Sequence, residues 1–197
     1  SFSNEVSQSL PTAVTLATKD KKDFENISKL IPDKEFRIYY SNDLIGTQIG
    51  GALKNIYAIA AGVAEGLNLG ENAKSALISR SFAEMTRYAK KFKADKNTLF
   101  GLSGLGDLIL TCSSKNSRNT QFGIKLASSK YDNFLDLLKS QEVTEGYYTV
   151  KAVYNISQKK NIDMPIMESV YNILYKQHDL KEELSNLLSR PITEEKI

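Results

Sequence analysis

Apolar residues follow a strand-like pattern only in the first forty residues of the chain. The segments TAVTLA at 12–17 and FRIYY at 36–40 are rich in β-branched and aromatic residues, which favour strands. Between them, 20–30 carries apolar residues at helical spacing. A strand, a helix and a second strand in this order predict one unit of a parallel sheet. Because two strands make no stable sheet alone, we expect this unit to be the end of a larger α/β domain.

From residue 43 onward the apolar pattern is almost entirely helical. Periodicity and capping residues predict helices near 43–65, 71–93, 118–128, 131–140, 146–160, 166–176 and 180–189. Residues 103–119 are expected to form a glycine-rich turn, a short apolar segment and a polar loop. The chain is therefore predicted to be mainly α, with a β-α-β remnant over 1–42 and a helical domain over 43–197.

The helix predicted at 43–65 carries a stripe of small residues with a lysine in its middle. Gly46, Gly50, Lys54 and Ala58 recur every four residues and so share one face. Glycine inside a helix costs about 0.5–1 kcal/mol relative to alanine, which indicates that another backbone or a ligand comes close. Burial readily lowers the pKa of a lysine, so a lysine on such a face can exchange a proton. The alternative is a lysine that snorkels out of a helix–helix contact.

Composition narrows the class of protein. The net charge of +3, from 26 basic and 23 acidic residues, is too small to indicate nucleic acid or a membrane surface. Cys112 is the only cysteine, which excludes a disulfide framework and a cysteine zinc site and favours the cytoplasm. His178 is the only histidine, so histidine-based metal sites are weakly supported and no metal is expected. The sequence contains no uncharged apolar run long enough to span a membrane.

The segment Ser117–Arg118–Asn119 is a candidate anion site. Ser117 is a good N-cap, which places Arg118 in the first helical turn, where a cation opposes the helix dipole. A phosphate held between Arg118 and the free N–H groups of that turn removes the conflict, with Asn119 adding an amide. The alternative is a surface arginine paired with a nearby carboxylate.

Two carboxylates stand at predicted starts of secondary structure. Asp107 follows the turn Gly104–Gly106 and could bind a substrate hydroxyl or the ammonium of Lys54, or simply cap a helix. Glu145 begins a predicted helix, where a carboxylate is favoured by the dipole. A contact from Glu145 to a nicotinamide or a ribose is the functional alternative.

Several motifs occur together in a specific order: GGALKN, GLGDL, SRN and VTEGY. With these motifs the chain resembles the bacterial NAD(P)-dependent glycerol-3-phosphate dehydrogenases over nearly its whole length. The resemblance implies a Rossmann-type domain followed by an all-helical C-terminal domain like that of 6-phosphogluconate dehydrogenase. It also implies interconversion of sn-glycerol 3-phosphate and dihydroxyacetone phosphate with NAD or NADP, for glycerophospholipid synthesis in the cytoplasm.

The resemblance assigns roles to individual residues. It implies that Lys54 is the proton acceptor and also contacts substrate. The implied substrate-binding residues are Ser1, Asp107, Ser117, Arg118 and Asn119, and the implied cofactor-binding residues are Ser3, Arg118, Val143 and Glu145. The stripe around Lys54 is then expected to admit backbone of the dinucleotide domain, or the cofactor itself.

The sequence departs from the family in one large respect, because the G-x-G-x-x-G fingerprint and the first strands are absent. We therefore expect the chain to be a C-terminal fragment that is inactive alone. Most of the cofactor site, including the residues that select NAD or NADP, is then expected in the missing N-terminal part. Two alternatives stay open: a related 2-hydroxyacid or 6-phosphogluconate-type dehydrogenase, and a non-catalytic helical dimerisation or scaffold module. A homodimer is also left open.

Overall fold

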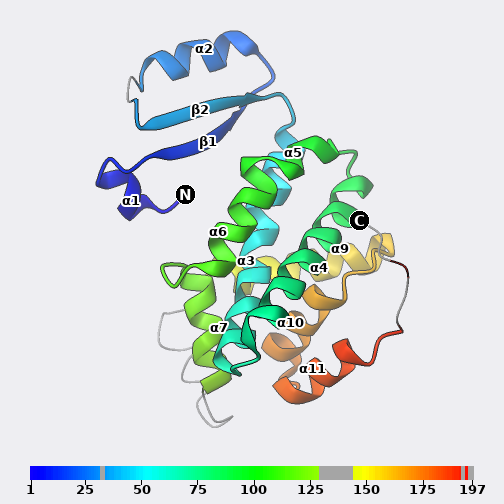
Figure 1. Cartoon of the computed structure of the whole chain (residues 1–197). Coiled ribbons are helices and arrows are strands. Elements are labelled where there is room, and N and C mark those ends of the chain that lie inside the picture. The colour runs from blue at the N-terminus through cyan, green and yellow to red at the C-terminus, as the bar shows by residue number, and fades with distance from the viewer. Residues whose placement is uncertain (32–33, 129–143, 192–193, 195–197) are drawn as a thin grey trace.

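A small β-α-β unit stands on one end of a larger helical body (Figure 1). The computed structural model describes residues 1–31, 34–128, 144–191 and 194. The helix predicted at 131–140 lies outside these described residues. The mainly helical class predicted from the sequence is confirmed, and so is the order of strands and helices in the first forty residues.

The β-α-β unit follows a short first helix, α1 (Ser3–Ser7), and comprises β1 (Thr12–Ala17), α2 (Lys21–Lys29) and β2 (Phe36–Ser41). The two strands are parallel and in register from Thr12 opposite Phe36 to Ala17 opposite Ser41. Asp20 begins α2, because its carboxylate accepts a hydrogen bond from the amide of Lys22 at 2.8 Å. Parallel register brings the carboxyl ends of both strands to the same edge of the sheet.

The helical body begins three residues after β2. Its elements are α3 (Leu44–Gly66), α4 (Gly70–Lys91), α5 (Lys96–Phe100), the π-helical turn η1 (Leu102–Gly106), α6 (Asp107–Ser113), α7 (Arg118–Ser128), α9 (Glu145–Lys160), α10 (Pro165–Lys176) and α11 (Leu180–Leu188). The region 103–119 is thus more helical than the sequence indicated. In the described part of the chain, no helix is long and apolar enough to cross a membrane.

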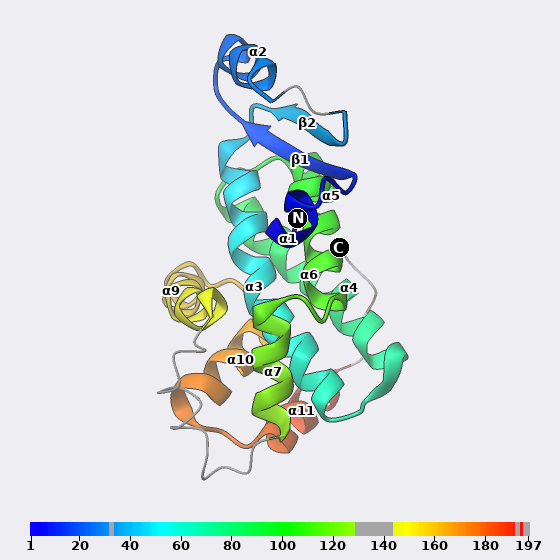
Figure 2. The ribbon, with the colours of Figure 1, turned by 90° about the vertical axis from the view of Figure 1, so that its left-hand side faces the viewer.

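Helix α3 is the centre of the body, with α4, α6, α7 and α9 around it (Figure 2). Thirteen of its 23 residues are buried. Ile56, Tyr57, Ala58 and Ala61 are wholly inaccessible to solvent. Burial of each large apolar side chain stabilises the fold by about 1.5–3 kcal/mol, so this helix organises the core.

Glycines of α3 allow neighbouring backbones to approach closely. A Cβ on Gly50 would overlap the carbonyl of Ser103 in η1, and a Cβ on Gly62 would overlap the carbonyl of Thr120 in α7. The expectation of a close backbone is confirmed at these positions. Its assignment to the dinucleotide domain or the cofactor is wrong here, since the neighbours belong to the helical body itself.

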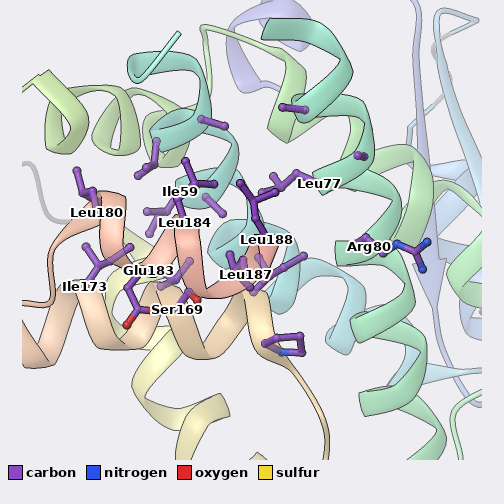
Figure 3. A pocket seen from close by; sticks show the side chains of 18 of the residues that line it. Ile59, Leu77, Arg80, Ser169, Ile173, Leu180, Glu183, Leu184, Leu187 and Leu188 are labelled. Carbon is purple, nitrogen blue, oxygen red and sulfur yellow. The ribbon is translucent and has the colours of Figure 1, made fainter. Parts of the chain in front are cut away.

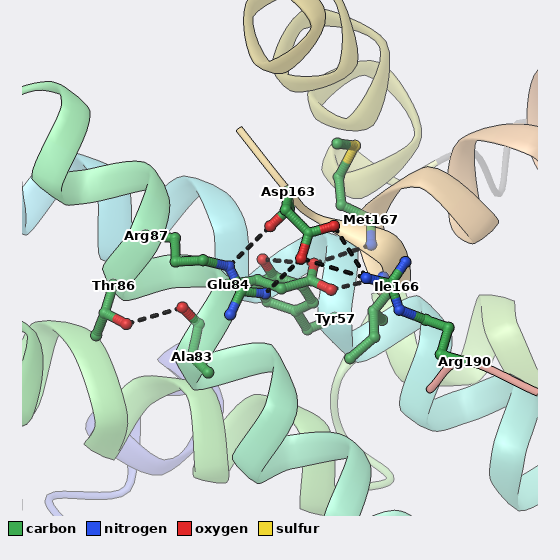
Figure 4. A network of polar contacts seen from close by, with 9 residues as sticks. All are labelled: Tyr57, Ala83, Glu84, Thr86, Arg87, Asp163, Ile166, Met167 and Arg190. Carbon is green, nitrogen blue, oxygen red and sulfur yellow. Dashed lines mark hydrogen bonds and ion pairs between the residues drawn. The ribbon is translucent and has the colours of Figure 1, made fainter. Parts of the chain in front are cut away.

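A buried carboxylate ties α4 to the start of α10 (Figure 4). Glu84 is 1% exposed and accepts hydrogen bonds from the amides of Ile166 at 2.6 Å and Met167 at 3.1 Å. The hydroxyl of Tyr57 donates to the same carboxylate at 3.3 Å. Burial raises the pKa of Glu84 to about 7, although the two amides act in the opposite direction. This side chain therefore holds three helices together.

Candidate functional site

Lys54 and Asp107 form an ion pair beside α3. Lys54 projects from the middle of α3, and Asp107 is the first residue of α6, directly after η1. Because η1 packs on Gly50, one helical turn before Lys54, Asp107 at the start of α6 lies beside Lys54. The two side chains are 21% and 18% exposed, so the pair can be reached from solvent. The predicted contact between Asp107 and the lysine ammonium is present.

Ser1 lies next to the same pair. The nitrogen of its terminal amino group is 3.4 Å from Oδ1 of Asp107, while Oδ2 of that residue faces Lys54. The first residue of the chain and two elements of the helical body thus meet at one carboxylate. The family resemblance implies that Ser1, Lys54 and Asp107 belong to one substrate site, and the structure brings the three residues together.

A chain of amide hydrogen bonds joins α3, α7 and α9 behind this pair. Asn55 Oδ1 accepts from Asn119 Nδ2 at 3.0 Å, and Asn119 Oδ1 accepts from the amide of Gly146 at 3.0 Å. Asn55 Nδ2 also donates to Oε2 of Glu145 at 3.1 Å. Asn55 and Asn119 are 7% and 8% exposed. The network fixes the starts of α7 and α9 relative to Lys54.

The start of α7 has the predicted cap and an exposed arginine beside a carboxylate, the alternative that the sequence left open. Ser117 Oγ accepts from the amide of Thr120 at 3.2 Å and is buried, which confirms the N-cap. The side chain of Arg118 is 84% exposed and lies 3.9 Å from Oε1 of Glu145, itself 70% exposed. An ion pair this exposed contributes little stability, so Arg118 can turn toward an anion at modest cost.

Not every predicted site residue joins the cluster. Ser3 is exposed at the first position of α1. Val143 lies outside the described residues. Asn55 was missed by the sequence reasoning, although it belongs to the GGALKN motif and follows Lys54 directly. No local sequence pattern indicates its hydrogen bond to Asn119, which lies 64 positions away.

Gly51 leaves an open face beside the pair. Among the residues that the structure describes, a Cβ there would meet no atom within 4 Å, in contrast to Gly50 before it. Lys54 and Asn55 lie three and four residues further along α3 and share this face.

Cys112 and His178 contact residues of the fold rather than of the candidate site. Cys112 is wholly buried, and burial raises the pKa of its thiol to about 12, which makes it unreactive. His178 Nδ1 lies 2.7 Å from Oε1 of Glu183, between α10 and α11. Among the described residues, no group of three or more histidine, cysteine, aspartate or glutamate side chains could hold a metal ion.

A separate pocket of about 510 Å³ lies between α11 and the helices α3, α4 and α10 (Figure 3). Its lining is mainly aliphatic, with leucines of α11 facing Ile59 and Leu77. Arg87 and Arg190 at its edge both contact Asp163, and Glu84 is held by α10 (Figure 4). The pocket contains none of the site residues described above.

Comparison with known sequences gives a consistent result. The sequence model of the family described as NAD-dependent glycerol-3-phosphate dehydrogenase C-terminus matches residues 43–185. A glycerol-3-phosphate dehydrogenase [NAD(P)+] of Solidesulfovibrio magneticus is 46% identical over 196 residues, which are 99% of this chain. The protein of the same name from Colwellia psychrerythraea is 43% identical over 96% of the chain. The chain spans 59% of the length of the first relative and 57% of the second.

Solved structures show the same similarity in three dimensions. The crystal structure of glycerol-3-phosphate dehydrogenase from Coxiella burnetii superposes with a TM-score of 0.89 at 37% identity, over 96% of this chain and 58% of that one. The enzyme of Plasmodium falciparum superposes with a TM-score of 0.82 at 26% identity, over 98% of this chain and 56% of that one. The helical body and the β-α-β unit are therefore both shared with these proteins.

Proposed function

Because this chain belongs to the NAD-dependent glycerol-3-phosphate dehydrogenase family, we propose that the complete protein interconverts sn-glycerol 3-phosphate and dihydroxyacetone phosphate. The observation that carries the proposal is the partly exposed Lys54–Asp107 pair where α3 meets α6. NAD or NADP, when bound, accepts the hydride from C2 of glycerol 3-phosphate. The residues of this chain bind, orient and deprotonate the substrate.

Lys54 is the proposed proton acceptor. Loss of hydride from a secondary alcohol leaves a carbonyl, so the hydroxyl proton must pass to a base in the same step. In the reverse direction the ammonium of Lys54 returns the proton and stabilises the developing alkoxide. Asp107 holds the lysine side chain in place, and with Ser1 it contacts the substrate hydroxyls. The partial exposure of the pair leaves room for that contact.

The start of α7 is the proposed phosphate site. Arg118 supplies the charge, and the first N–H groups of this 11-residue helix point along its axis toward an anion. Ser117 orders the turn through its cap, and Asn119 couples it to Asn55, next to Lys54. Holding the phosphate at one end presents C2 to Lys54 at the other, which makes the chemical step effectively intramolecular.

Four residues of this chain would hold the cofactor in the complete protein. They are proposed to be Ser3, Arg118, Val143 and Glu145. Glu145 is suited to this role because it is exposed and anchored by Asn55. Glycerol 3-phosphate made in this way would enter glycerophospholipid synthesis in the cytoplasm.

An assay of the complete protein tests the proposal. NADH or NADPH oxidation is followed with dihydroxyacetone phosphate, with unphosphorylated dihydroxyacetone and with a 2-oxoacid. We expect turnover only with the phosphorylated ketone, because Arg118 is matched to an anion at the end of the substrate. Turnover of the 2-oxoacid alone would assign the chain to a different dehydrogenase reaction.

A further inference from the structure

The carboxylate of Asp43 joins two helices at the point where the chain enters the helical body. Its Oδ1 accepts a hydrogen bond from the amide of Gly46 in the first turn of α3 at 2.9 Å, which makes Asp43 the N-cap of that helix. Its Oδ2 accepts a hydrogen bond from the amide of Asp95 at 2.9 Å, directly before α5. The first bond is an ordinary cap, whereas the second ties the start of α5 to α3.

Gly46 allows the carboxylate to make both bonds. A Cβ at this position would overlap Oδ2 of Asp43, the oxygen that accepts from Asp95. Burial acts to raise the pKa of Asp43, but the hydrogen bonds, first among them those from the amides of Gly46 and Asp95, lower it below its ordinary value. The carboxylate is therefore ionised at neutral pH, and its charge strengthens both hydrogen bonds.

The bond between Asp43 and the start of α5 is the first of three contacts between α3 and the segment 95–107. Further along α3, the turn η1 packs on Gly50. The last contact is the ion pair of Lys54 with Asp107. The contacts follow the same order in both partners, so the segment lies along α3 from its first turn to the proposed proton acceptor.

The segment 95–107 links the position of its start to that of Asp107 at its end. A single residue separates α5 from η1, and α6 follows η1 directly. The backbone of Gly104 in η1 packs against the backbone of Leu99 in α5, because glycine has no Cβ to keep them apart. A shift of the start of α5 is therefore expected to move η1 and the first residue of α6 with it.

We propose that Asp43 is a positioning residue for the reaction, because it binds the start of α5 to the first turn of α3 and so sets Asp107 in place beside Lys54. This inference rests on the proposed function and adds a residue that is not among the proposed substrate and cofactor contacts. A displacement of about 1 Å at a catalytic group can lower a rate about 10²-fold, so a bond remote from Lys54 can still affect the chemical step.

The experiment uses the complete protein with Asp43→Asn and Gly46→Ala. Asparagine is as good an N-cap as aspartate, but it has one acceptor oxygen, so it keeps the bond to Gly46 and loses the bond to Asp95. Alanine at position 46 keeps Asp43 and displaces its Oδ2. The rate constant of hydride transfer from NADH or NADPH to dihydroxyacetone phosphate is measured in single turnovers, because it does not depend on the folded fraction of the enzyme.

For both variants we expect folded protein and a rate constant lowered about 10- to 100-fold. Asp179→Ala is the matched control. Asp179 also accepts two amide hydrogen bonds, from Lys181 and Glu182, but both amides belong to the helix that it caps. Asp179→Ala should lower the unfolding temperature through loss of a cap and leave the rate constant unchanged.

Three results would overturn the inference: a wild-type rate constant in Asp43→Asn, an equal fall of the rate constant in Asp179→Ala, or failure of both Asp43→Asn and Gly46→Ala to fold. The second would attribute the effect to lost stability, and the third would make Asp43 a residue of the fold alone. Absence of turnover of dihydroxyacetone phosphate by the wild type would instead refute the proposed function, and this inference with it.

Discussion

Lys54 and Asp107 lie 53 positions apart in the sequence and form an ion pair where α3 meets α6. Asp107 reaches Lys54 because the π-helical turn η1 packs on Gly50 and then leads directly into α6. The pair keeps a fifth of each side chain accessible. This exposure leaves the pair accessible to a substrate.

Replacement of Lys54 by methionine should remove the proton acceptor while keeping an unbranched side chain of similar length. We expect kcat in the complete protein to fall by about 10²–10⁴, the usual contribution of a positioned acid or base. Steady-state kinetics with dihydroxyacetone phosphate measure this. The control is Lys74→Met, which breaks the 2.8 Å ion pair with Glu65 away from the site and should leave kcat unchanged. Equal kcat in Lys54→Met and the wild type would remove Lys54 from proton transfer.

Arg118→Ala should act on the affinity for the phosphorylated substrate. Hydrogen bonds to charged groups contribute about 1.5–3 kcal/mol, so KM should rise about 10- to 100-fold. Thermal stability should stay the same, because Arg118 is 84% exposed and its ion pair with Glu145 is weak. Lys115→Ala removes a cation that is 79% exposed just before α7 and serves as the control. An equal rise in KM in both variants would point to a general charge effect rather than a phosphate contact.

Gly62→Ala should destabilise the fold, in contrast to Gly51→Ala. A Cβ at position 62 would overlap the carbonyl of Thr120 and press on Gly123 in α7, and backbone cannot move aside as a flexible side chain can. Overpacking of this kind costs about 1–3 kcal/mol. Calorimetry on the two variants compares one added methyl group in two surroundings on the same helix. Similar unfolding temperatures for both would show that α7 is less closely packed on α3 than the structure indicates.

Much of the local structure could be predicted from the sequence. Strand-like composition at 12–17 and 36–40 and helical periodicity after 43 gave the elements because these patterns depend on neighbouring residues only. The GGALKN motif singled out Lys54 because a lysine among glycines and alanines is unusual. The resemblance to the family then brought Asp107 and Ser117–Asn119 to the same site.

The contacts between elements could not be predicted in the same way. Asn55 meets Asn119 across 64 positions, and Glu84 meets Ile166 across 82. The first depends on how α7 packs on α3 and the second on how α4 and α10 come together, and periodicity specifies neither. The glycines of α3 show the same limit, since the sequence indicated a close backbone but not that η1 and α7 supply it.

Glu84 gives the last prediction, because its proton affinity differs between the folded and the unfolded chain. Burial raises its pKa from an ordinary value of 4.5 to about 7, against the opposing effect of the amides of Ile166 and Met167 and of Arg87 (Figure 4). A group with a raised pKa in the folded state contributes stability that is fully present below its unfolded pKa. That contribution declines as the pH rises and is lost above the folded pKa.

The wild type should therefore lose about 3 kcal/mol more stability than Glu84→Gln between about pH 4.5 and about pH 8, because glutamine does not titrate. Urea unfolding at several pH values in this window measures the difference, and other titrating groups cancel between the two proteins. The control Glu168→Gln removes a less buried carboxylate from the first turn of α10 and should keep the wild-type pH dependence. Parallel pH profiles for the wild type and Glu84→Gln would show that Glu84 remains ionised in its buried position, held by the amides of α10.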